Sequence, residues 1–142
     1  MLEFQLFLSV FLQVLLILYV GVKLAVVRNK ALKNGEAKLK DIAFNNTAWP
    51  DYAKKAQNSL SNQFEMPMLF ILAVLFIVQQ NLADLVFVAL AHIFVISRWI
   101  HMFIHTGSNN LYHRAGAYLV GLIAVFGIWF YLAWQYFSRI YL

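Results

Sequence analysis

The chain has 142 residues, of which 63 % are hydrophobic and 12 % are charged, and it contains no cysteine. A chain this apolar falls outside the range of ordinary soluble domains, and it is too short for two domains. The absence of cysteine excludes disulfides, thiolate metal ligands and a thiol nucleophile carried by the protein itself. We therefore expect one integral membrane domain over residues 1–142, with packing between copies of the chain.

The net charge of +5 at pH 7 is compatible with a nucleic-acid partner. Most of the basic residues, however, lie in one polar segment, residues 28–57, between two apolar runs. Such clustering is typical of a cytoplasmic loop, and it lacks the interleaved exposed aromatic residues of a nucleic-acid-binding stripe. We therefore expect membrane lipids, and no nucleic acid, as partners.

Four apolar stretches are long enough to cross a bilayer, which requires about 20 helical residues. They cover residues 2–27, 58–79, 85–104 and 112–137. The predicted fold is an all-α integral membrane bundle of four transmembrane helices. Because the first loop is basic and the second turn carries no Lys or Arg, both termini should lie outside the cytoplasm.

The first stretch carries Gln5, Ser9 and Gln13 on one helical face. This pattern predicts a hydrogen-bonding seam with another helix. Lys23, near the inner end of the same stretch, is placed to extend its ammonium group to the lipid headgroups.

The second stretch is the most informative. We expect a helix with Asp51 as its cap, helical from Tyr52 onward and continuing into the membrane without a break, with a kink beside Glu65 caused by Pro67. Asn58, Asn62 and Glu65 fall on a single face of this helix. The uninterrupted apolar run begins only at Met66, so Asn62 and Glu65 must enter the bilayer. A carboxylate there costs about 2.5–3.5 kcal/mol, and it normally has a partner and marks a functional site.

The third stretch places Arg98, His101 and His105 on one helical face, and the fourth does the same for Arg114 and Tyr118. The fourth stretch also has two small residues, four positions apart, that let a neighbouring helix approach closely. These are Ala117 and Gly121.

Counting inward from the outer turn at about 1.5 Å per residue places Glu65 and Arg98 at the same depth, each about 21 Å down. We therefore expect the two side chains to meet. His101 and Asn62 should lie about one turn nearer the cytoplasm, with Arg114 at the inner boundary. The predicted site is a polar cleft, open to the cytoplasm, that takes a small polar ligand.

Two other interpretations remain open. Glu65 and Arg98 could be a buried ion pair that only holds two helices in register. His101 and His105 also have the spacing of two imidazole metal ligands, with Glu65 or His113 completing the set. Two arginines beside the cation argue against a metal, so the predicted set of metal ligands is empty.

The run NQFEMP at residues 62–67, followed by Arg98-x-x-His101 and Arg114-x-x-x-Tyr118, resembles the MAPEG family, membrane-associated proteins in eicosanoid and glutathione metabolism. The resemblance extends over nearly the whole chain, including its length, its four spans and its basic first loop. It implies a homotrimer of four-helix subunits with glutathione bound between neighbours near the cytoplasmic face.

The resemblance also implies residue roles. Asn62, Glu65 and Arg98 match residues that hold the tripeptide, with His101, His105 and Tyr118 in the same pocket. Arg114 matches the catalytic arginine that holds the glutathione sulfur as thiolate. The expected activity is that of a glutathione transferase or glutathione-dependent peroxidase acting on lipophilic small molecules.

The sequence departs from glutathione-using members at Asn58, where they commonly have arginine, and at His105, where they have tyrosine. These changes resemble the less characterised prokaryotic branch, which implies a bacterial inner membrane, and they leave the identity of the thiol open. A non-catalytic protein of the same fold that binds or presents a lipid is the alternative.

Overall fold

The computed structural model describes residues 1–43 and 48–141, and within them the chain is helical and has no strand. The helices are α1 (Leu2–Lys33), α2 (Leu39–Ile42), α3 (Asp51–Ser61), α4 (Met66–Gln79), α5 (Leu85–Thr106) and α6 (Leu111–Tyr141). Four segments of the described chain are long and apolar enough to cross a membrane, namely Leu2–Lys33, Asp51–Gln79, Leu85–Thr106 and Leu111–Ile140. The all-helical, four-span fold class is thus confirmed.

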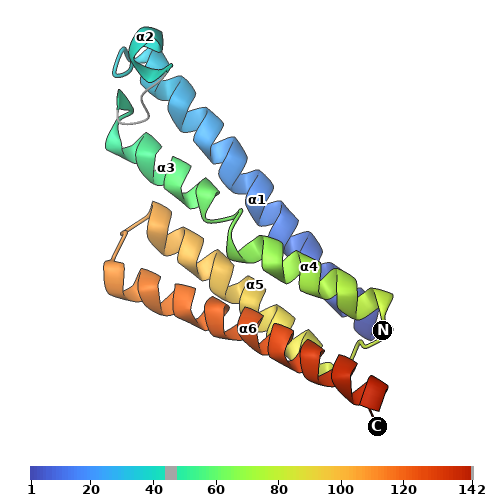
Figure 1. Ribbon diagram of the computed structural model, residues 1–142. Helices are drawn as coiled ribbons and strands as arrows, with labels where there is room; N and C mark the ends of the chain where they lie inside the picture. The colour runs from blue at the N-terminus through green and yellow to red at the C-terminus, as the bar shows by residue number, and fades with distance from the viewer. Residues whose placement is uncertain (44–47, 142) are drawn as a thin grey trace.

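The four spans pack against one another, and Figure 1 shows α3 and α4 in line as the two halves of the second span. Both termini lie at the same end of the bundle, and α2 lies at the far end. This arrangement follows from an even number of crossings. The basic end of the bundle, which holds α2, is therefore opposite the end that holds the termini.

The second span is broken, so the prediction of a continuous helix was wrong. α3 ends at Ser61, α4 begins at Met66, and Glu65 between them has φ −96° and ψ −102°. Pro67 explains the position of the break, because its ring would crowd the carbonyl of Gln63 in a continuous helix. In the structure Pro67 lies in the first turn of α4, where its missing N–H removes no helical hydrogen bond.

The break is tied to α1. Gln63 is fully buried, and its side-chain oxygen accepts a hydrogen bond from Nε2 of Gln13 at 3.1 Å. Nε2 of Gln63 in turn donates to the carbonyl of Ser59 at 3.3 Å. The predicted seam on the first helix is confirmed at Gln13, and its partner is the non-helical segment between α3 and α4.

Helices α5 and α6 pack closely where α6 has no side chain. A Cβ atom placed on Gly121 would lie 2.6 Å from Oγ of Ser97 and 3.6 Å from Cδ of Arg98. This confirms at Gly121 the close approach predicted for the small residues of the fourth span. Further along the bundle, the rings of Phe70 and Phe94 stack with their centroids 4.5 Å apart in the main apolar core.

Trp49 and the start of α3 pack against the C-terminal part of α1. Nη2 of Arg28 donates to the side-chain oxygen of Gln57 at 2.9 Å, and its guanidinium lies 4.8 Å from the ring centroid of Trp49. Trp49 is buried in a small cluster with Ala31 and Ala53. The start of α3 is therefore fixed against α1, which also fixes the position of the break that follows.

Candidate functional site

A polar cavity with a volume of about 640 Å³ opens beside the turn that joins α5 to α6. This volume is within the range of about 300–1,000 Å³ that is usual for small-molecule sites. Its lining comes from the α3–α4 segment, from α5 and from α6. The lining residues are Asn58, Asn62, Glu65, His101, His105, Leu111, Arg114, Ala115, Tyr118 and Leu119. Six of the seven predicted site residues are in this set, and Arg98 is not.

Arg98 lies behind the cavity wall, where its side chain binds the backbone at the break between α3 and α4. Its side chain is 1 % exposed, and Nη2 donates to the backbone carbonyl of Asn62 at 3.0 Å. Its guanidinium also lies 5.7 Å from the ring centroid of Tyr118. Because α3 ends here, the Asn62 carbonyl has no helical partner, and a charged donor satisfies it.

The expected ion pair between Glu65 and Arg98 is not formed. The one ion pair within 4 Å in the described part of the chain joins Lys54 to Asp51. Glu65 is exposed on the cavity wall at the N-cap position of α4. The predicted pairing with Arg98 assumed that Glu65 lies on one face of a continuous helix. Because the helix is broken here, Glu65 does not lie on that face. Its carboxylate lies instead at the positive end of the α4 dipole, which favours a negative charge.

The two histidines form an edge-to-face pair beside Tyr118. The ring centroids of His101 and His105 are 5.7 Å apart, and that of Tyr118 is 5.8 Å from His101. Both histidines are buried, and within the described chain Nδ1 of each has no hydrogen-bond partner, nor has Nε of Arg98. Buried polar atoms are costly to leave unpaired, so these three nitrogens are candidates for contacts with a ligand or a second subunit.

The metal interpretation requires a cluster of ligands. Among the residues described by the structure, no group of three or more His, Asp or Glu side chains is placed to hold a metal ion. His101 and His105 therefore contribute two adjacent imidazoles and no third ligand.

Arg114 stands at the start of α6 and is held by a residue that the sequence analysis did not select. Its Nη1 donates to Oδ1 of Asn109 at 2.8 Å. Asn109 has a φ of 52°, a left-handed conformation in which asparagine is one of the few well-tolerated residues, and its backbone N–H bonds the carbonyl of Ile104 at 2.7 Å. The signal that could have revealed it is the pair of asparagines, Asn109 and Asn110, directly before the first residue of α6, Leu111.

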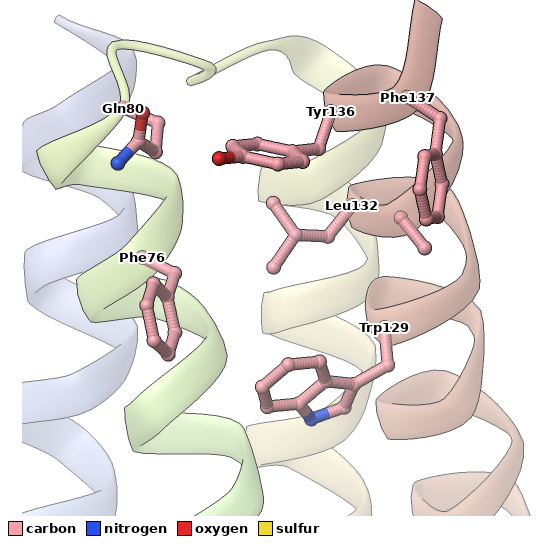
Figure 2. A pocket seen from close by; sticks show the side chains of 7 residues that line it. Phe76, Gln80, Trp129, Leu132, Tyr136 and Phe137 are labelled. Atoms are coloured by element: carbon pink, nitrogen blue, oxygen red, sulfur yellow. The ribbon is translucent and has the colours of Figure 1, made fainter. Parts of the chain in front are cut away.

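A second hollow, of about 320 Å³, lies between α4 and α6 at the end of the bundle that holds the termini. Figure 2 shows Phe76 of α4, and Gln80 directly after that helix, facing Trp129, Leu132 and Tyr136 of α6. Its lining is mostly apolar and has no Asp, Glu, His, Lys or Arg. It can hold an apolar group, whereas the cavity beside Arg114 combines cationic, anionic and amide side chains.

The model of the MAPEG family matches residues 6–134, a range that includes every residue lining the polar cavity. The chain belongs to the MAPEG family. No curated protein and no solved structure matches this MAPEG protein. Membership supports, in general terms, an integral multi-pass membrane protein with a function related to glutathione, and it confirms the resemblance drawn from the motifs.

Proposed function

We propose that this MAPEG protein is a membrane-bound glutathione transferase or glutathione-dependent peroxidase acting on lipophilic electrophiles or hydroperoxides. The observation that carries the proposal is the guanidinium of Arg114, held by Asn109 at a cavity that also contains Glu65. Bound glutathione would supply the reactive thiol, which a chain without cysteine cannot.

The residues present fit this tripeptide. Glutathione carries two carboxylates, one ammonium and a thiol, and the cavity offers Glu65 for the ammonium and Arg114 for the thiolate sulfur. Asn62 adds an amide that can both donate and accept hydrogen bonds. The unpaired Nδ1 atoms of His101 and His105 add two buried polar positions that a polar ligand would satisfy.

In this proposal Arg114 is the catalytic residue. A guanidinium beside the sulfur favours the thiolate, which is the nucleophilic form. Arg98 acts from behind the wall by fixing Asn62 and the ring of Tyr118. Tyr118 and the two histidines complete the pocket around the thiol cofactor.

The remaining assignments concern the assembly. We infer a homotrimer in which a neighbouring subunit completes the cavity, supported by the membership of the chain in the MAPEG family. The basic charge of segment 28–57 supports the assignment of this segment as a cytoplasmic loop. In a bacterial inner membrane, both termini would then lie on the side opposite the cytoplasm. The mass of the detergent-solubilised complex tests the trimer, and protease accessibility of the loop in vesicles tests the orientation.

Calorimetric titration of the purified protein with glutathione tests the cofactor, and turnover with an aryl halide or a lipid hydroperoxide tests the chemistry. Loss of a preorganised donor to a reacting anion typically costs about 10²–10³ in kcat, so Arg114→Ala should lower kcat by that factor. Lys40→Ala, which removes an exposed cation from α2, is the matched control and should leave kcat unchanged. Equal turnover in the two variants would show that Arg114 is not part of the mechanism. If the titration gives no heat of binding, glutathione is not the cofactor.

The alternative is a non-catalytic protein that binds or presents a lipid. The apolar hollow between Phe76 and Trp129 favours it, because its lining suits an acyl chain rather than a tripeptide (Figure 2). Thermal stabilisation by lipids, with none by glutathione and no thiolate absorbance on mixing, would support this alternative over the enzyme.

A further inference from the structure

A smaller hollow, of about 170 Å³, lies between α1, α3 and α5 and shares no lining residue with the polar cavity. Its walls combine two ammonium groups from different helices with two hydroxyl groups and two aliphatic side chains. The lining residues are Lys23, Val27, Tyr52, Lys55, Ala56 and Thr106.

The hollow lies where three helices leave the apolar part of the bundle. On α1, Lys23 and Val27 directly precede the basic segment that begins at Arg28. Lys55 lies on α3, before the apolar helix α4, and Thr106 is the last residue of α5. In a bilayer this is the level of the lipid headgroups at the basic end of the protein.

Among the described residues, the two lysines of this hollow have no acidic partner, although the ammonium group of Lys23 lies 6.0 Å from the ring centroid of Tyr19. Lys54 pairs with Asp51 at 3.3 Å, but in residues 1–43 and 48–141 neither Lys23 nor Lys55 has a carboxylate within 4 Å. The hydroxyl group of Tyr52 already donates to Oε2 of Glu36 at 2.9 Å. That of Thr106 donates to the carbonyl of Met102 at 3.0 Å. The chemistry on offer is thus a pair of positive charges in a concave site.

We propose that this hollow binds the phosphate group of an anionic phospholipid. Basic pockets between transmembrane helices on the cytoplasmic side suit anionic headgroups. Lys23 and Lys55 contact the phosphate from two sides, and Val27 and Ala56 provide an apolar wall for the glycerol and the first acyl carbons. This location favours a lipid over a dissolved phosphate, because lipid phosphates are concentrated at this depth. The site is independent of the glutathione proposal.

Native mass spectrometry of the detergent-solubilised protein, titrated with phosphatidylglycerol, phosphatidylcholine or soluble glycerol phosphate, tests the site. Phosphatidylglycerol should bind most tightly. Each lysine near an anionic group contributes about fivefold in affinity, so Lys23→Gln/Lys55→Gln should weaken phosphatidylglycerol binding about 25-fold. Lys38→Gln/Lys40→Gln removes the same charge from exposed positions at the start of α2 and should leave binding unchanged.

If both double variants lose the same amount of affinity for phosphatidylglycerol, the proposal is overturned, because the lipid is then attracted to the basic loop in general. Phosphatidylcholine binding as tightly as phosphatidylglycerol would also overturn it, and so would glycerol phosphate binding as tightly as the lipid. If a variant does not fold, the salt dependence of phosphatidylglycerol binding to the wild-type protein tests the proposal instead. Its affinity for phosphatidylglycerol should fall as salt is raised, since exposed charges are screened, and a salt-independent affinity would refute the lysine pair.

Discussion

Arg98 provides the sharpest test of how the interior is held together. Its guanidinium is almost completely buried and donates at 3.0 Å to the Asn62 carbonyl at the helix break. Arg98→Met keeps much of the side-chain volume and removes every donor. Hydrogen bonds to charged groups contribute about 1.5–3 kcal/mol, so we expect the free energy of unfolding to fall by that amount.

Thermal unfolding in detergent, followed by circular dichroism, measures the effect. At about 2–4 °C per kcal/mol, Tm should fall by about 3–12 °C. Glu65→Gln is the matched comparison, because Glu65 is exposed and has no ion pair within the described chain. Its loss removes only a favourable charge at the start of α4, about 0.3–1 kcal/mol.

The double variant decides between the observed geometry and a buried ion pair. Without direct contact, the effects of Arg98→Met and Glu65→Gln should add within about 0.5 kcal/mol. If Glu65→Gln destabilises the protein as much as Arg98→Met, and the two effects are strongly non-additive, the two side chains interact directly and the reasoning from the helix break is refuted.

Three more predictions follow from single contacts. Asn109→Gly should lower kcat while leaving Tm nearly unchanged, because glycine tolerates the left-handed backbone and the change frees the Arg114 guanidinium. Asn109→Asp should keep the activity, and unchanged kcat in Asn109→Gly would contradict a positioning role. Gly121→Ala should cost about 1–3 kcal/mol of unfolding free energy by overpacking, and Ser97→Ala in the same chain should recover most of it; a silent Gly121→Ala would disprove the close approach. Gln13→Leu should lower the free energy of unfolding by about 1–3 kcal/mol, since it leaves the buried side-chain oxygen of Gln63 without a donor, and Tm measures this loss.

The features that could be predicted from sequence are those set by length and periodicity. Four apolar runs long enough to span a bilayer dictate four helices, because backbone groups in lipid must be satisfied within the segment. The face shared by His101 and His105 survives in the structure, because α5 is regular from end to end. The close approach at Gly121 follows in the same way from the spacing of small residues on α6.

The features that could not be predicted depend on local backbone geometry. Pro67 indicated a disturbance, but sequence does not distinguish a kinked helix from two helices joined by residues 62–65. The direction of Glu65 follows from that choice, so its pairing with Arg98 was inferred from a face that does not exist. Asn109 was missed because its contribution comes from a left-handed turn conformation, which leaves no periodic pattern.

The helix break explains how polar groups are accommodated in an otherwise apolar bundle. Ending α3 at Ser61 frees the Asn62 carbonyl, which gives the buried Arg98 an acceptor without a carboxylate. Starting α4 at Met66 creates a positive helix end beside Glu65, which can then face the cavity without a cationic partner. In a continuous helix the carbonyl would be occupied, and the two charges would have to neutralise each other. The break therefore keeps both charges stable while leaving the carboxylate available to a ligand.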